Sequence, residues 1–293
     1  MFETIKQNRI YSFITISIIY ILTNILGILT YYYFSQKYIF YINLLLTDII
    51  CTLFVFIFSL LFSNSSVYDP YWSVQPIVIA LSFQYFISDS LNLIRILLHF
   101  SILFWGIRLT LNWAYTSHNL YTQDWRYVYL KEVTNIFYPF INLFGIHLFP
   151  TIIVYLCVLP SVYIIMFKCK EINLFVILSF LLSIIAIILE SVADYQMHMF
   201  RKNKNNKEKF IRNGLWKYSR HPNYLGEILF WWGIGFMAIF GLEEKNYYLL
   251  IGPLSCNLMF VLATIHLADN HQKRKKGFDK YYKETNMLLP FNI

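Results

Sequence analysis

Long apolar runs alternate with short polar segments along the whole chain. A helix that crosses the hydrocarbon core of a bilayer needs about 20 mostly apolar residues. Seven runs come close to or exceed that length, and an eighth is short for a span. The runs cover residues 11–34, 40–62, 74–88 (the short one), 93–113, 147–167, 172–198, 223–241 and 247–267. The pattern predicts an all-α fold, a polytopic membrane helix bundle with seven to eight transmembrane helices.

The composition excludes other broad classes of protein. Hydrophobic residues make up 58% of the 293 residues and charged residues 14%, whereas soluble domains are about 45–50% apolar and about 25% charged. An aromatic content of 20% excludes a disordered chain. The four cysteines form no CxxC pair and no metal-ligand spacing, so neither a disulfide scaffold nor a bound metal is expected. Without a repeat or a Gly/Ser linker, residues 1–293 are predicted to form a single membrane domain.

The distribution of positive charge predicts the topology. The chain carries 24 Lys and Arg against 16 Asp and Glu, a net charge of +8, and basic residues gather on the cytosolic side of membrane proteins. Eight spans and a cytosolic N-terminus place most of them on that side, including segments 201–220 and 268–293, so both termini are predicted to be cytosolic. Lys168 and Lys170 fit this topology poorly, and seven spans would move one terminus across. Because the basic residues flank spans, the expected partners are membrane lipids and not nucleic acid.

Several ionisable residues lie in or beside the apolar runs, where a charge is costly and indicates a site. They are Asp48, Asp89, Arg95, His99, Arg108, Glu190, Asp194, His198, Glu227, His266 and Asp269. Residues three or four apart share a helix face. This spacing gives three polar stripes: Glu190, Asp194, His198 and Arg201; Asn223 and Glu227; and His266, Asn270, Lys273 and Arg274. One stripe would be explained by pairing of buried charges alone, but three on one membrane edge favour a ligand pocket in the C-terminal half.

The segment around Pro222 adds a predicted anion site to this region. Pro222 suits the first turn of a helix because it has no N–H to leave unpaired. The free N–H groups and the positive dipole end at such a helix start attract anions, and Gly226 lets a ligand or another helix approach the backbone. A Rossmann dinucleotide fold is excluded because no Gly-rich phosphate loop is present. The HExxH and GxSxG motifs are also missing.

Several motifs together resemble one superfamily. The longest is RNGLWKYSRHPNYLGEILFWWG (212–233). The others are VYDPYWSV (67–74), WGIRLTLNWA (105–114), QDWRY (123–127), HLFPT (147–151), ESVADYQM (190–197) and KGFDKYYKETNMLLP (276–290). The chain resembles the steroid 5α-reductase C-terminal superfamily, and in particular its "steroid 5α-reductase family enzyme" branch. The superfamily also includes sterol reductases and isoprenylcysteine carboxyl methyltransferases. The likeness covers 67–293 as a reductase-like region, whereas 1–66 matches only as generic membrane helices.

The resemblance implies an NADPH-dependent reductase that acts on a carbon–carbon double bond, an enone, in a steroid, sterol or other lipid. Asn-Tyr-x-Gly-Glu at 223–227 is similar to the reductases, and 268–270 lacks the Glu-Glu pair of the methyltransferases. Asn223 would hold the nicotinamide amide, and Arg201 and Arg274 would grip phosphates. The predicted cofactor-binding residues lie in the C-terminal half (190–293), except for two that precede it. They are Arg108, Asn112, Glu190, Asp194, Arg201, Tyr218, Arg220, His221, Asn223, Tyr224, Glu227, Asn270, His271 and Arg274.

The resemblance also implies a pair of catalytic donors. Hydride addition to an enone develops negative charge on the carbonyl oxygen, which needs a hydrogen-bond donor already in place. Steroid reductases use a Glu and a Tyr, and Asp69 falls at the position of that Glu. Tyr71 or Tyr115 would be the second donor. A helix cap is an equal interpretation of Asp69.

Two other functions stay open from the sequence. One is an S-adenosylmethionine-dependent membrane methyltransferase of the isoprenylcysteine type, and the other is a non-catalytic lipid-binding membrane protein. The substrate partner is expected to be a lipid or sterol-like small molecule. The resemblance implies the endoplasmic reticulum, and a prokaryotic plasma membrane fits the sequence as well.

Overall fold

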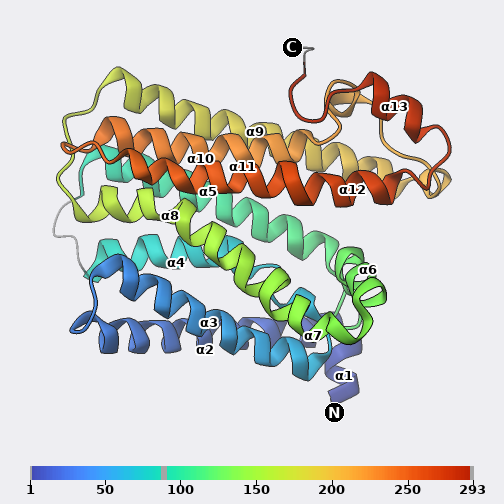
Figure 1. Ribbon diagram of the computed structural model, residues 1–293, viewed down its shortest axis with the longest axis horizontal. Helices are drawn as coiled ribbons and strands as arrows, with labels where there is room; N and C mark the ends of the chain where they lie inside the picture. The colour runs from blue at the N-terminus through green and yellow to red at the C-terminus, as the bar shows by residue number, and fades with distance from the viewer. Residues whose placement is uncertain (1, 87–90, 291–293) are drawn as a thin grey trace. The chain divides into compact units, whose positions relative to one another are not determined.

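The computed structural model describes residues 2–86 and 91–290, and these are almost entirely helical (Figure 1). The described residues contain no β-strand, only two isolated bridges, Cys169–Leu242 and Ser219–Asn286. The predicted all-α fold is therefore confirmed. The α-helices are α1 (Phe2–Gln7), α2 (Arg9–Ser35), α3 (Phe40–Phe62), α4 (Tyr71–Phe86), α5 (Leu93–Thr116), α6 (Trp125–Thr134), α7 (Tyr138–Phe140), α8 (Phe149–Met166), α9 (Leu174–Lys202), α10 (Pro222–Gly241), α11 (Ile251–Met259), α12 (Ile265–Gln272) and α13 (Phe278–Glu284).

Shorter helical turns complete the chain. Two segments have π-helical hydrogen bonding, η3 (Ile141–Leu148) before α8 and η7 (Phe260–Thr264) between α11 and α12. The 3₁₀ turns are η1 (Ser65–Val67), η2 (Asn135–Phe137), η4 (Lys204–Asn206), η5 (Gly214–Lys217) and η6 (Tyr247–Leu250). π-Helical segments are rare and occur frequently at functional sites.

Seven helical stretches of the described chain are long and apolar enough to cross a membrane. They are Arg9–Ser35, Phe40–Phe62, Leu93–Thr116, Trp125–Met166, Leu174–Lys202, Pro222–Gly241 and Tyr247–Gln272. The protein is therefore an integral membrane protein, as predicted. Helix α4 has only 16 residues, and the last two residues of the predicted run 74–88, like Asp89, lie outside the described residues. The cytosolic termini and the organelle stay predictions.

The chain divides into two compact units. Unit 1 comprises Met1–Ser82 and Trp105–Leu159, and unit 2 comprises Phe83–Phe104 and Pro160–Ile293. The chain passes from one unit to the other within α4, α5 and α8. The single membrane domain stays a prediction.

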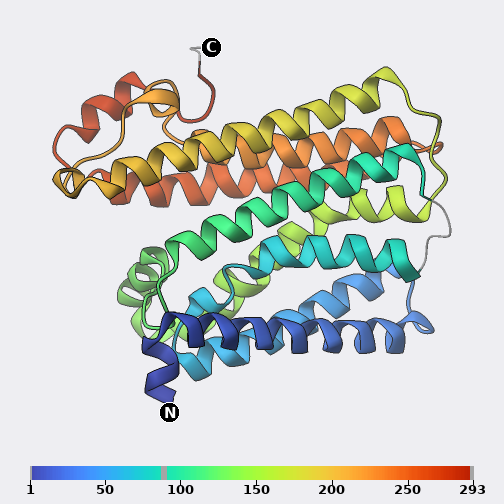
Figure 2. The ribbon, with the colours of Figure 1, turned by 180° about the vertical axis from the view of Figure 1, so that it is seen from behind.

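In unit 1, α2 and α3 run side by side (Figure 2). Gly27 of α2 lies close to α3, because a Cβ there would be 3.1 Å from the Cys51 sulfur. Tyr20 of α2 packs in the same core, and its hydroxyl donates to the Val67 carbonyl at 2.8 Å. This core fixes the segment between α3 and α4, which carries Asp69.

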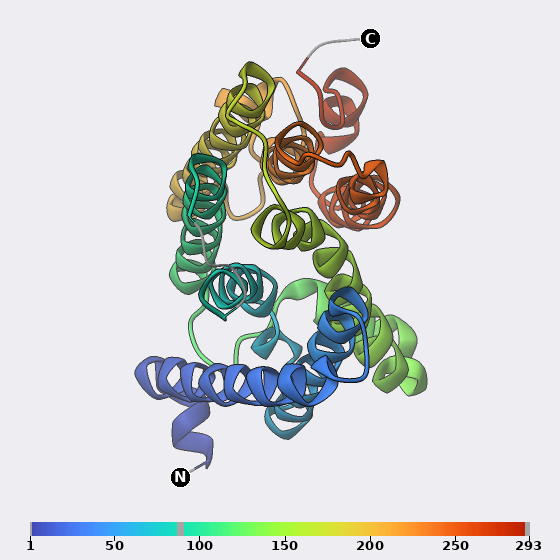
Figure 3. The same ribbon diagram turned by 90° about the vertical axis from the view of Figure 1, so that its left-hand side faces the viewer.

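In unit 2, α9 and α10 lie side by side (Figure 3), and the contacts of two glycines show that they are antiparallel and closely packed. Gly226 and Gly233 of α10 are seven residues apart and face α9. A Cβ on Gly226 would lie 2.8 Å from the Ala186 carbonyl oxygen, and one on Gly233 would lie 2.9 Å from that of Ser179. Small residues at a helix interface let the backbones approach in this way. The contact brings Glu190 of α9 against Gly226, near the start of α10.

Candidate functional site

The centre of the candidate site in unit 2 is Asp269 of α12, which is buried. Its Oδ2 accepts from Arg220 Nη2 at 3.1 Å, and its Oδ1 lies 2.9 Å from His221 Nε2. Arg220 and His221 are also buried and directly precede α10. A buried carboxylate is tolerated when a cation and further hydrogen bonds compensate it. Asp269 stood among the intramembrane ionisable residues but not in the predicted cofactor set.

Arg220 connects this cluster to the segment around α13. Its Nη1 donates to the carbonyl oxygens of Tyr282, at 3.0 Å, and Thr285. Its guanidinium carbon lies 4.2 Å from the centre of the Tyr282 ring, and its backbone N–H donates to the Asn286 carbonyl at 2.9 Å. The guanidinium is therefore used chiefly within the protein. Arg220 holds the chain after α13 beside the start of α10.

His221 begins a column of aromatic rings. The His221 and Tyr224 rings are parallel, with an interplanar angle of 1° and centres 5.2 Å apart. Tyr224 in turn packs on Phe260, with ring centres 4.9 Å apart. Phe260 is the first residue of the π-helical segment η7. Asp269 thus orients His221, and His221 orients the half-buried ring of Tyr224.

The first turns of α10 carry an amide and a carboxyl side chain in contrasting surroundings. Asn223 is half-buried, and its Oδ1 atom is buried with no hydrogen-bond partner among the described residues. Buried polar atoms nearly always have a partner, so this oxygen is an acceptor suited to an N–H group of a ligand. Glu227 is buried, and its Oε1 accepts from Trp231 Nε1 at 2.8 Å. Glu190, also buried, packs its Cβ against Gly226.

Basic side chains gather near the end of α9. Arg201 is exposed, and Lys275 is half-buried with its Nζ donating to the Lys209 carbonyl at 2.8 Å. Burial, and then the nearby Arg201 charge, lower the pKa of Lys275. Two cations held close together make a favourable surface for an anion. Lys275 was missed as a site residue, because nothing in the sequence distinguishes it from the other lysines of segment 268–293.

The remaining predicted cofactor residues of unit 2 differ in burial. Asp194 and His271 are half-buried, whereas Tyr218, Asn270 and Arg274 are exposed. Arg108 and Asn112 are half-buried and belong to unit 1, whereas the other twelve predicted cofactor residues belong to unit 2. In the part of the chain that the structure describes, no group of three or more His, Cys, Asp or Glu side chains is arranged to hold a metal ion.

In unit 1 the two predicted donors, Asp69 and Tyr71, belong to two separate carboxyl–tyrosine pairs. Tyr127 Oη donates to Asp69 Oδ1 at 2.6 Å, and Tyr71 Oη donates to Asp48 Oδ1 at 2.7 Å. The predicted donors Asp69 and Tyr71 are therefore each bound to a different partner. Tyr115, the alternative donor, is exposed. Tyr127 was missed although it lies in the QDWRY motif, because its contact with Asp69 spans 58 positions of the chain.

The surroundings of Asp69 favour its neutral form. Burial raises the pKa of this carboxyl to about 7, with a further contribution from the Asp124 carboxylate. The hydrogen bond from Tyr127, the charge of Arg126 and a hydrogen bond with the Ser66 side chain oppose that shift. Asp124 itself is paired with Arg126 at 2.8 Å. A substantial fraction of Asp69 is therefore protonated near neutral pH.

Together these features define a polytopic membrane helix-bundle protein with buried polar clusters in both units. A family model described as "Protein of unknown function (DUF1295)" matches residues 55–285, and the chain belongs to that family. It is similar to "Uncharacterized protein C594.04c" of Schizosaccharomyces pombe, with 27% identity over 192 residues. That match covers 57% of this chain and 56% of the yeast protein, so the chain spans about half the length of this curated relative. No solved structure matches the chain.

Proposed function

We propose that the protein is an NADPH-dependent reductase of a carbon–carbon double bond conjugated to a carbonyl in a steroid, sterol or other lipid. The motifs that resemble the steroid 5α-reductase superfamily suggest this chemistry. The observation that carries the proposal is the buried, unpartnered Oδ1 of Asn223 at the start of α10. Asn223 comes two positions after His221, whose ring Asp269 holds in place.

The residues of unit 2 fit such a cofactor. A carboxamide offers N–H donors and a carbonyl acceptor, and the Asn223 side chain offers the complementary pair. The basic residues Arg201, Arg274 and Lys275 and the N-terminus of the 20-residue helix α10 suit phosphate groups. Bound NADPH would supply the hydride, while the protein supplies position and electrostatics.

The residues of unit 1 supply a donor for the carbonyl oxygen of the substrate. The protonated Asp69 accepts the Tyr127 hydroxyl at Oδ1 and also has a hydrogen bond with the Ser66 side chain. In this proposal its carboxyl O–H is the donor to the substrate. A neutral carboxyl held in this way stabilises the charge that develops on the oxygen during hydride addition. Tyr127 acts as a positioning residue because it fixes the orientation of Asp69. Tyr71 has its hydroxyl committed to Asp48, so we propose Asp69 as the principal donor.

Cofactor titration tests this proposal. The purified full-length protein in detergent is titrated separately with NADPH and with S-adenosylmethionine, and NADPH fluorescence reports the first. We expect NADPH to bind and Asn223→Ala to weaken it by about tenfold, the equivalent of about 1.4 kcal/mol for one lost polar contact.

Asn205→Ala is the matched control, because Asn205 is an exposed asparagine in the loop after α9. It should bind NADPH as the wild type does. Binding of S-adenosylmethionine without NADPH binding would favour the methyltransferase instead. Binding of neither, together with retained lipid binding, would favour the non-catalytic alternative.

A further inference from the structure

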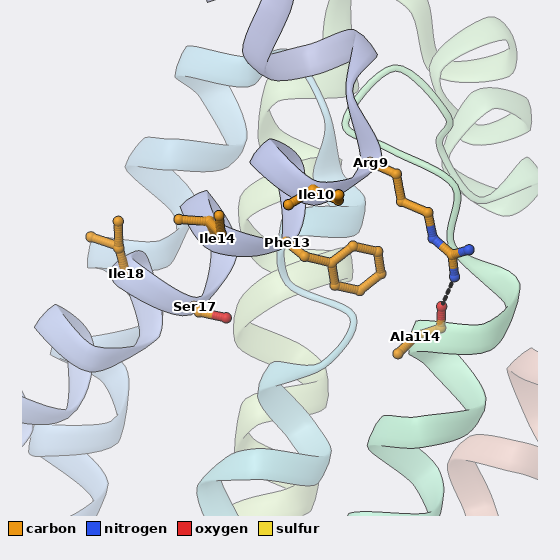
Figure 4. Close-up of a pocket in the computed structure, with 7 residues that line it drawn as sticks. All are labelled: Arg9, Ile10, Phe13, Ile14, Ser17, Ile18 and Ala114. Atoms are coloured by element: carbon orange, nitrogen blue, oxygen red, sulfur yellow. Dashed lines mark hydrogen bonds between the residues drawn. The ribbon is translucent and has the colours of Figure 1, made fainter.

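A second candidate binding site lies on unit 1, and none of the predicted cofactor-binding residues lines it. A groove with a volume of about 640 Å³ runs along the first turns of α2 (Figure 4). Its wall repeats at intervals of three and four residues, as one face of a helix does. We call it the α2 groove, and its main lining residues are Arg9, Phe13, Ile14, Ser17, Ile18 and Ala114. Its volume is that of a small-molecule site.

The lining is apolar and open. The opposite face of α2 carries Ile16, Ile19 and Tyr20, which are buried in the core of unit 1. In the groove, Ile14 is 50% and Ile18 51% exposed. Because α2 is long and apolar enough to cross a membrane, exposed isoleucines on it meet hydrocarbon. The occupant that suits this wall is an acyl chain.

The mouth of the groove carries its one charged lining residue, Arg9. Arg9 is the first residue of the membrane-crossing stretch, so its side chain lies at the boundary where lipid headgroups begin. Its Nη2 donates to the Ala114 carbonyl of α5 at 2.8 Å, as Figure 4 shows. This is the one hydrogen bond of the guanidinium among the described residues, and a guanidinium has five N–H donors. Arg9 is therefore anchored but still has donors to offer.

The surroundings of Arg9 are weakly basic. Lys6 of α1 lies in the turn before it, with its Nζ 4.7 Å from the centre of the Tyr121 ring. The carboxylate of Glu3 accepts from the Tyr121 hydroxyl, and no acidic residue lines the groove. A phosphate matches the planar fork of Arg, and the extra lysine favours a lipid with a net negative headgroup over a zwitterionic one.

We propose that the α2 groove binds one anionic phospholipid, with its phosphate at Arg9 and one acyl chain along Ile14 and Ile18. Charge complementarity at the mouth and the apolar wall beyond it both point to this occupant. The proposal is independent of the reductase function, because it uses none of the residues assigned to the cofactor or the substrate carbonyl.

Native mass spectrometry of the delipidated full-length protein in detergent tests the proposal. Phosphatidylglycerol and phosphatidylcholine with identical acyl chains are added separately, and the fraction of protein with one lipid bound is measured. We expect phosphatidylglycerol to bind at about tenfold lower concentration. Arg9→Gln should remove this preference, Arg9→Lys should retain part of it, and Ile14→Trp should weaken both lipids by filling the groove.

Two matched variants separate the groove from general effects. Lys37→Gln removes one positive charge at the other end of α2, and Ile21→Trp adds the same bulk at an exposed position that does not line the groove. Both should bind lipid as the wild type does.

Three results would overturn the proposal. The first is equal binding of the two lipids by the wild type. The second is an equal loss of phosphatidylglycerol binding in Lys37→Gln and Arg9→Gln, which would show general attraction. The third is unchanged binding in Ile14→Trp, a surface substitution that keeps the test available if Arg9→Gln fails to fold.

Discussion

Replacement of Asp269 by Asn should destabilise unit 2 strongly. Asp269 accepts from Arg220 and lies against His221, and all three are buried. Loss of one partner from a buried ion pair costs about 3–5 kcal/mol, and Asn keeps one acceptor oxygen, so we expect about 3 kcal/mol. With an unfolding entropy of about 2.1 cal/mol/K per residue, the 293 residues give about 0.6 kcal/mol/K. The expected fall in Tm is then about 5 °C.

The free cysteines provide the assay. Cys51, Cys157 and Cys256 are buried, whereas Cys169 is partly exposed. In a Cys169→Ser background, a thiol-reactive fluorophore reports only on cysteines that unfolding exposes. Asp279→Asn is the matched control, because Asp279 is an exposed aspartate on α13. It should unfold within about 1 °C of the parent, since surface substitutions usually change stability by less than about 0.5 kcal/mol.

A double-mutant cycle measures the coupling between Asp269 and Arg220. If the cost arises from an unpaired buried Arg220, then Arg220→Gln combined with Asp269→Asn should cost clearly less than the sum of the two single changes. Additive effects, or an Asp269→Asn variant as stable as Asp279→Asn, would refute the assigned role of the Asp269 cluster.

Two further predictions concern the helix seam and Asp69. Gly226→Leu should cost about 1–3 kcal/mol in the same assay through overpacking, because its Cβ would lie 2.8 Å from the Ala186 carbonyl. Gly145→Ala, where the nearest contact is 3.6 Å, should be nearly neutral; equal effects would contradict the close packing. Because the pKa of Asp69 is raised to about 7 from 3.8, the folded protein binds this proton more tightly than the unfolded chain. The free energy of unfolding of the wild type, relative to that of Asp69→Asn, should therefore fall as pH rises from about 4 to about 7. If the free energies of the two proteins changed in parallel over this pH range, the raised pKa of Asp69 would be refuted.

The membrane-crossing helices could be predicted from the sequence because hydropathy, and the residues that favour the start of a helix, are local features of the chain. The run 40–62 coincides with α3, and α10 begins at Pro222, as its missing N–H suggested. Seven helices reach spanning length, whereas α4, with 16 residues, is the short run that makes the predicted count seven to eight. The π-helical segments η3 and η7 left no such local signal.

The candidate site was less accessible to prediction, because periodicity gives the residues that share a helix face but not the direction of that face. His266 and Asn270 belong to the predicted stripe and are exposed, whereas Asp269, on a neighbouring face of α12, is buried in the cluster. The contact between Arg220 and Tyr282 spans 62 positions, and no spacing rule reaches that far.

The tight pairing of α9 with α10 has a consequence for biogenesis. Glu190 and Glu227 lie within apolar segments, and an acidic group at the centre of an inserting helix costs about 2.5–3.5 kcal/mol when the helix meets lipid alone. The glycine seam lets the two helices, which are joined by residues 203–221, leave the translocation channel as one hairpin, with Glu190 facing α10 from the outset. We therefore expect membrane insertion of this half of the chain to proceed in pairs of helices and not one helix at a time.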